Sequence, residues 1–148
     1  MSGRVVQILY HGTPHDQSGY DILNYGFVIG QGDTFGSGLY LGDLQTAKSY
    51  TRGTGIIIKV KIDVPEHQVI DNSELIASPG FTQWTLNQVG VSLGDNITTY
   101  TIQVLNKRFI RVNPSYYVAL AHKTALNERV FFEGLTILGV LDAIGNPI

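Results

Sequence analysis

The chain contains no cysteine, and this absence excludes disulfide bonds, thiolate nucleophiles and cysteine-ligated zinc together. Charge is also scarce, because Asp, Glu, Lys and Arg make up 15% of the 148 residues and leave a formal net charge of -2. Such a composition disfavours tight, phosphate-driven binding of nucleic acid. Side-chain chemistry must therefore come from His, Tyr, Glu and Asp.

Long apolar runs are missing as well. No run approaches the roughly 20 residues of a membrane-spanning helix, and the opening MSGRVVQILYHG lacks the pattern of a signal peptide. We therefore expect a soluble protein, cytoplasmic or exported without a signal peptide, and no membrane partner. The length fits one domain over residues 1–148, without repeats or linkers, and we expect a monomer.

Metal-binding patterns are not present either. His15, His67 and His122 are widely separated, and none belongs to an H-E-x-x-H sequence. We therefore expect no metal.

Local patterns predict a mixed α and β chain. Runs rich in β-branched and aromatic residues predict strands at 5–10, 56–64, 108–112, 129–132 and 135–141. Helices are expected at 18–25, at 71–76 and from a cap at Asp43 to Tyr50. The strands at 129–132 and 135–141 are expected to lie side by side.

Other segments are harder to assign. Five glycines among residues 26–38 predict a loop with special backbone angles. The threonine-rich segment 97–104 favours a strand, residues 84–89 show only a weak pattern, and residues 115–120 fit a strand or a helix equally well.

Polar and aromatic residues recur where predicted elements end. His11-Gly12-Thr13 follows the first strand, Phe35-Gly36-Ser37-Gly38-Leu39-Tyr40 follows the glycine-rich segment, Tyr50 ends a helix, and Asn127-Glu128 precedes an apolar strand. Taken singly, such a histidine or tyrosine is more often structural than functional. The order of the four motifs, however, resembles the poly(ADP-ribose) polymerase-like branch of the ADP-ribosyltransferases. Diphtheria-type toxins share the His-Gly-Thr and the paired tyrosines.

The resemblance covers residues 10–50 and 127–140 and implies an α+β fold. That fold is a split pair of antiparallel β-sheets with short helices, which holds NAD+ as co-substrate in the cleft between the sheets. Family analogy implies that His11 binds the adenine ribose beside Thr13, and that the backbone of Gly12 meets the nicotinamide carboxamide. Tyr40 and Tyr50 would then sandwich the nicotinamide ring.

One interval departs from the family pattern. Tyr40 and Tyr50 are one residue closer together than is common in the family, so Thr46, Ala47 and Ser49 all compete for the place of a nicotinamide-binding serine. We prefer Thr46. The segment 26–38 is shorter than the donor-site loop of the polymerases, and we expect a more open cleft.

A carboxylate is needed beside the ribose, because breaking the nicotinamide–ribose bond creates an oxocarbenium-like centre. Family analogy assigns this role to Glu128, which would bind the ribose 2'-hydroxyl and help to activate the acceptor. Glu133 is the rival, and the two would point to opposite faces of one extended strand. Catalytic roles therefore go to His11, Tyr40 and Glu128.

The resemblance implies NAD+-dependent ADP-ribosyl transfer, and the small size favours single transfer to a macromolecule, with protein preferred over nucleic acid. Within the same fold the alternatives are an NAD+ glycohydrolase, a nucleic-acid ADP-ribosyltransferase and an RNA 2'-phosphotransferase, the last disfavoured by the slightly acidic charge. From another class, the alternative is an inactive module that binds NAD+ or ADP-ribose.

Overall fold

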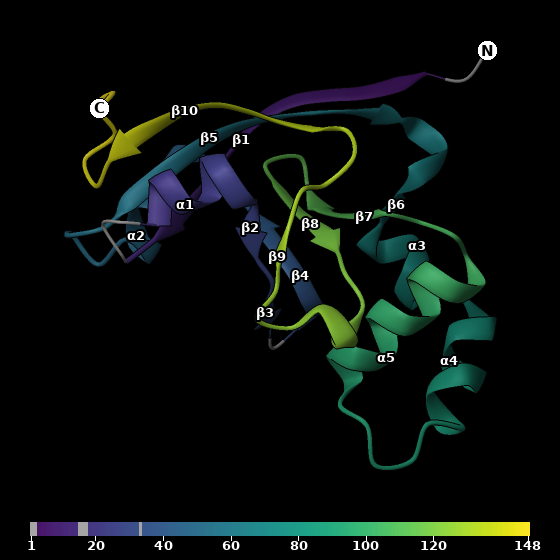
Figure 1. Cartoon of the computed structure of the whole chain (residues 1–148). Helices are drawn as coiled ribbons and strands as arrows, with labels where there is room; N and C mark the ends of the chain where they lie inside the picture. Colours follow the sequence, from purple (N-terminus) through teal and green to yellow (C-terminus); the bar gives the residue numbers. More distant parts are fainter. Residues whose placement is uncertain (1–2, 15–17, 33) are drawn as a thin grey trace.

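Two β-sheets form the centre of the computed structural model, which describes residues 3–14, 18–32 and 34–148; His15 lies outside this part (Figure 1). The first sheet has the order β1-β5-β10 and is antiparallel throughout. Its strands are β1 (Arg4–Thr13), β5 (Ile56–Pro65) and β10 (Leu135–Asp142). The central strand β5, which contains the strand predicted at 56–64, buries its alternate residues from Ile58 to Val64.

The second sheet has the order β3-β4-β8-β7-β6, with antiparallel pairs except for the parallel pair β6 and β7. Its strands are β3 (Gly30–Gly32), β4 (Gly36–Leu41), β6 (Val69–Asp71), β7 (Phe109–Asn113) and β8 (Tyr116–Leu120). A short antiparallel pair joins β2 (Phe27–Val28) to β9 (Arg129–Val130). The chain is thus α+β with two main sheets.

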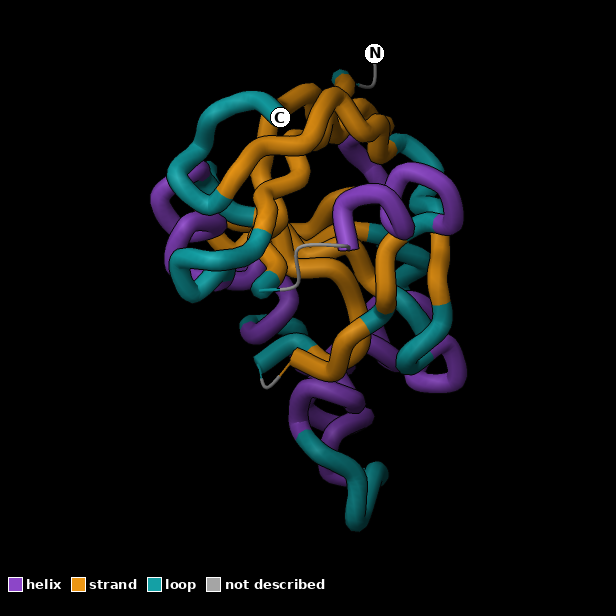
Figure 2. The backbone as a smooth tube through the Cα atoms, turned by 60° about the vertical axis from the view of Figure 1, so that its left-hand side comes forward, coloured by secondary structure: helices purple, strands orange, loops and turns teal. Residues whose placement is uncertain are grey.

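Short helices occupy two separate places (Figures 1 and 2). The helices α1 (Ser18–Tyr25) and α2 (Leu44–Tyr50) lie beside the first sheet. A helical lobe beside the second sheet contains α3 (Asn72–Ile76), α4 (Pro79–Leu86), α5 (Leu93–Thr99) and the π-helical turn Tyr100–Val104. Single 3-10 turns are found at Glu66–Gln68 and Lys123–Ala125. Among the described helices, none has the length and apolar character needed to cross a bilayer.

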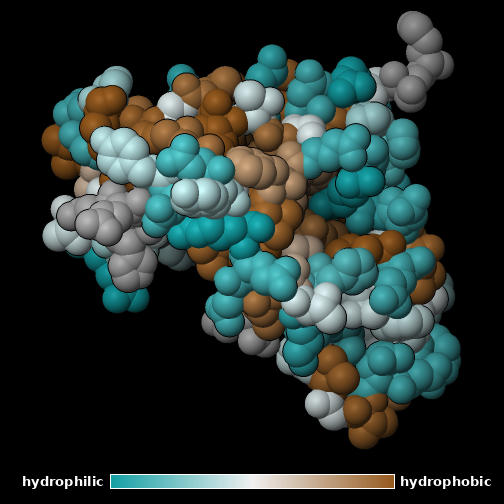
Figure 3. Space-filling model, viewed as in Figure 1, coloured by the Kyte–Doolittle hydropathy of each residue, from teal (hydrophilic) through white to brown (hydrophobic). Residues whose placement is uncertain are grey.

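Two apolar clusters hold these layers together. The first joins the sheets and includes the buried side chains of Leu9, Phe27 and Ile58. The second lies between the five-stranded sheet and the helical lobe and includes Leu75 and Val118. Apolar atoms also reach the surface at the far tip of this lobe (Figure 3), to which the exposed Leu86, Val89 and Leu93 contribute.

Several sequence predictions are confirmed. The helix at 18–25 is present with the predicted limits, and the Asp43 carboxylate accepts a hydrogen bond of 2.7 Å from the Thr46 amide to cap α2. The segment 115–120, which fitted either type of element, contains β8 (Tyr116–Leu120), and this strand pairs with β4.

The prediction of a loop over residues 26–38 was wrong, because β2, β3 and the start of β4 lie there. The special backbone angles predicted for this segment are present, with a φ of +93° at Gly26 and +82° at Gly36. The glycines permit close packing within strands. A Cβ atom on Gly36 would lie 2.2 Å from the Gly94 carbonyl oxygen of α5, and one on Gly38 would lie 2.4 Å from the Ala119 carbonyl oxygen of β8. Glycine in a strand can mark the close approach of another backbone, which the loop prediction did not take into account.

The strand predicted at 97–104 was also wrong, because this segment is helical. The Ser92 hydroxyl caps α5, and the Thr101 hydroxyl donates 2.6 Å to the carbonyl oxygen of Ile97 one turn earlier. Tertiary burial and capping outweigh the β-propensity of its threonines here.

The two closing strands do not pair with each other as predicted. β9 pairs with β2, whereas β10 pairs with β5 in the other sheet. Gly134 has a φ of +80°, and a Cβ atom there would lie 2.2 Å from a methyl carbon of Val64. The chain therefore changes sheet around Gly134, which suits glycine alone.

Candidate functional site

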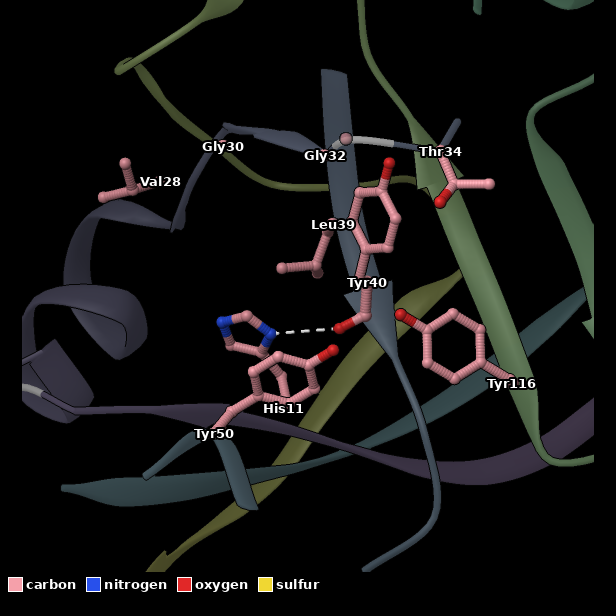
Figure 4. Close-up of a pocket in the computed structure, with 11 residues that line it drawn as sticks. His11, Val28, Gly30, Gly32, Thr34, Leu39, Tyr40, Tyr50 and Tyr116 are labelled. Carbon is pink, nitrogen blue, oxygen red and sulfur yellow. Dashed lines mark hydrogen bonds between the residues drawn. The ribbon is translucent and has the colours of Figure 1, made fainter. Parts of the chain in front are cut away.

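A cavity of about 420 Å³ opens where β1 approaches β4. This volume lies within the range of roughly 300–1,000 Å³ typical of small-molecule sites. Its walls come from both main sheets, from β2 and from the end of α2 (Figure 4). The described lining consists of His11, Gly12, Val28, Gly30, Gly32, Thr34, Gly38, Leu39, Tyr40, Tyr50 and Tyr116.

Backbone hydrogen bonds fix the two sheets together beside this cavity. The Tyr10 amide donates to the Gly42 carbonyl oxygen at 2.8 Å, and the Gly42 amide donates back to Tyr10 at 2.9 Å. One residue further along β1, His11 Nδ1 lies 3.1 Å from the Tyr40 carbonyl oxygen (Figure 4). Because a carbonyl can only accept, Nδ1 carries the proton and Nε2 is left as an acceptor.

His11 is neutral at physiological pH, because burial lowers the pKa of its imidazole and outweighs the opposing effect of the Tyr40 carbonyl. The ring meets Phe27 edge-on, with centroids 5.9 Å apart. A neutral imidazole presents the cavity with one hydrogen-bond acceptor and adds no charge.

The Tyr40 side chain is held at both its ring and its hydroxyl. The hydroxyl donates 2.7 Å to the Gly36 carbonyl oxygen and accepts 3.3 Å from the Phe35 amide. A Cβ atom on Gly32 would lie 1.8 Å from the same hydroxyl oxygen, so only glycine leaves room for it. The phenol ring is therefore a fixed wall of the cavity.

Gly12 allows α2 to approach β1. A Cβ atom on Gly12 would lie 2.0 Å from the Ala47 carbonyl oxygen, which belongs to the middle of α2. Tyr50, the last residue of α2, reaches the cavity with a side chain that is 55% exposed. The absence of a side chain on Gly12 thus lets Tyr50 reach the cavity.

Thr13 and Thr46 lie outside the cavity lining. Thr13 is buried at the end of β1, where its carbonyl oxygen lies 1.7 Å from the position that a Cβ atom on Gly55 would take. Thr46 packs beside Gly42. Ala47 and Ser49, which competed with Thr46 for the place of a nicotinamide-binding serine, also lie outside the cavity lining. Ala47 is buried, and the Ser49 hydroxyl donates 2.6 Å to the Thr46 carbonyl oxygen.

Glu128 is the last residue of a tight turn and the second residue of a β-bulge. The Glu128 amide donates 3.0 Å to the Ala125 carbonyl oxygen, and the two central residues, Leu126 at φ -54° and ψ 133° and Asn127 at φ +66°, match a type II turn. The Asn127 amide donates to the Ile29 carbonyl oxygen, and the Ile29 amide donates to Glu128. Asn127 and Glu128 thus lie opposite the single residue Ile29. This is the arrangement of a β-bulge whose first residue, here Asn127, is left-handed.

The Glu128 side chain is exposed and does not line the cavity. Its backbone is nevertheless adjacent to the wall, because Ile29 lies between the lining residues Val28 and Gly30. The expectation that Glu128 and Glu133 occupy one strand was wrong, since β9 ends at Val130. Glu133 lies 3.4 Å from Arg108 in an exposed ion pair.

The left-handed backbone conformation of Asn127 predicts how substitutions at this position change the stability of the protein. Asn127→Val should lower the free energy of unfolding by about 1–2 kcal/mol, because a β-branched residue is strained at positive φ. Asn127→Gly should stay within about 0.5 kcal/mol of the parent protein. Urea unfolding of the two variants measures the difference, and equal stability would contradict the turn geometry.

Tyr116 is a cavity residue that the sequence analysis did not identify. It begins β8, and its ring meets that of Tyr40 edge-on at 6.4 Å. Burial raises the pKa of its phenol, and the nearby Tyr50 and Tyr40 raise it further. Only the pairing of β8 with β4, which is distant in sequence, brings it to the site.

The described residues contain no group of three or more His, Asp or Glu side chains arranged to hold a metal ion. Comparisons with protein-family models, curated proteins and solved structures gave no match. The motifs and the geometry of this cavity are therefore the features that indicate a function.

Proposed function

We propose that the protein is an NAD+-dependent ADP-ribosyltransferase that binds the nicotinamide end of NAD+ in this cavity and transfers one ADP-ribose to a protein. The main support for the proposal is that residues from separate motifs come together in the structure. His11 and Gly12, Tyr40, and Tyr50 come from three separate motifs, and all of them line one cavity.

The lining suits the nicotinamide–ribose part of NAD+. The described lining residues carry no charged side chain at neutral pH, because His11 is neutral. Aromatic rings attract a flat pyridinium cation through stacking and cation–π contacts. The His11 Nε2 can accept a hydrogen bond from a hydroxyl of the adenine ribose, which is the role that family analogy gives it. A diphosphate, in contrast, finds no cation among these residues and would extend away from them.

The reaction would break the bond between the nicotinamide nitrogen and C1' of the ribose. Its electron pair leaves with nicotinamide, and the acceptor oxygen or nitrogen forms a new bond to C1' while losing its proton. A carboxylate stabilises the cationic transition state and can take up that proton. Glu128 would supply it, with the exposed side chain turning toward the ribose when NAD+ binds.

A second function, binding of NAD+ or ADP-ribose without turnover, is favoured by one observation. The Glu128 side chain does not line the cavity, so binding does not require it. The two functions differ in whether nicotinamide is released.

Chromatographic measurement of nicotinamide release from NAD+ tests the proposal. The expected result is release that is accelerated by an acceptor. Binding of NAD+ without any release would support the binding module instead, and release that is independent of an acceptor would indicate a glycohydrolase. Labelled NAD+ and a lysate identify the acceptor, because protein-linked label is lost with protease and nucleic-acid-linked label with nuclease.

A further inference from the structure

A third tyrosine faces the cavity from the second sheet. Tyr40 pairs with Val118, and Tyr116 lies two residues before Val118 on the same face of β8. The Tyr116 and Tyr40 rings are inclined at 68° with their centroids 6.4 Å apart, which is a favourable edge-on contact. One edge of the Tyr116 ring therefore rests on a side chain that is itself fixed.

The packing beneath Tyr116 also restricts its ring. A Cβ atom on Gly42 would lie 3.5 Å from Tyr116 Cδ2 and 3.0 Å from the Thr46 methyl carbon. The Tyr116 ring and the Thr46 side chain thus both pack into the space that a side chain on Gly42 would fill. Tyr116 is half-buried, with its orientation set by Tyr40, Gly42 and Thr46.

The free end of Tyr116 points across the cavity toward Tyr50 (Figure 4). Burial and the neighbouring Tyr50 both raise the pKa of the Tyr116 phenol. The phenol is therefore protonated at physiological pH and remains a hydrogen-bond donor. Tyr50, in contrast, ends a seven-residue helix and is 55% exposed.

We infer that Tyr116 is a positioning residue that holds the Tyr50 ring across the cavity, so that this ring is oriented to stack on a pyridinium before the ligand arrives. The inference rests on the proposed function and names the ligand part as a flat, cationic N-ribosyl pyridinium. A ring that is already ordered loses less rotamer freedom on binding, which corresponds to about 3- to 10-fold in affinity.

Tyr116→Phe tests this role, because it removes the hydroxyl and keeps the ring. The Kd and KM for NAD+ should rise about 3- to 10-fold, while kcat and the melting temperature stay unchanged. Tyr20→Phe is the matched control, since Tyr20 is 70% exposed and lines a separate apolar groove beside β10. An unchanged Kd in Tyr116→Phe would overturn the inference.

A double-mutant cycle with Tyr50→Phe identifies the route of the effect. If Tyr116 acts through Tyr50, the double variant should bind NAD+ no more weakly than Tyr50→Phe alone. Fully additive losses would overturn the positioning role while leaving NAD+ binding intact. If the parent protein itself fails to bind NAD+ in calorimetry, the proposed function is wrong and the inference fails with it, so the two failures are distinguishable.

Discussion

Glu128→Gln should lower kcat for nicotinamide release by about 10²- to 10³-fold, because it removes the charge that stabilises the oxocarbenium-like transition state. The Kd for NAD+ should change less than about threefold, since the Glu128 side chain is outside the cavity lining. Single-turnover release of nicotinamide and calorimetric binding of NAD+ measure the two quantities separately.

Glu133→Gln is the matched control for this prediction. Its carboxylate lies 3.4 Å from Arg108, and both side chains are more than half exposed, so the ion pair contributes little. Turnover should remain within about twofold of the parent protein. A large loss in Glu133→Gln with none in Glu128→Gln would show that the wrong carboxylate was assigned. Binding of NAD+ without turnover in the parent protein would favour the binding module.

Gly12→Ala should be strongly destabilising. The new methyl group would lie 2.0 Å from the Ala47 carbonyl oxygen, so α2 would have to move away from β1. Overpacking against a backbone atom costs about 3 kcal/mol, or roughly 10 °C in melting temperature. Because Tyr50 ends the same helix, NAD+ binding should weaken in parallel.

Gly139→Ala provides the control for this stability loss. Gly139 lies in β10, and no atom lies within 4 Å of the position that its Cβ would take. Its unfolding free energy should change by less than about 0.5 kcal/mol. Thermal unfolding of both variants settles the comparison, and a Gly12→Ala protein as stable as Gly139→Ala would refute the close contact between β1 and α2.

Local patterns in the sequence predicted the parts of the fold that local forces decide. The cap at Asp43 needs only the amide three residues later, and the alternation in β5 follows from burial of one face. In the helical lobe these rules hold for α3, the helix predicted at 71–76, but not for residues 97–104. There the threonines of 97–104 are helical, because α5 packs against Gly36 from a distant strand.

In the candidate site, too, some residues could be predicted from the sequence, whereas others depend on contacts between distant segments. Resemblance to a family suggested His11, Tyr40 and Tyr50 together, and in the structure these residues line one cavity. Tyr116 was missed because it belongs to no motif and comes to the cavity only through strand pairing across more than 70 residues. The position of Glu128 could not be anticipated either, since a left-handed Asn127 sets its direction.

The reciprocal hydrogen bonds between Tyr10 and Gly42 have a dynamic consequence. Amide protons exchange with solvent only when their hydrogen bonds open, and the free energy of opening differs between regions of a protein. Since these two bonds connect both sheets beside the cavity, the Tyr10 and Gly42 amides can exchange only when the sheets separate. Deuterium uptake at these two positions would therefore report how often the sheets come apart in the unliganded protein.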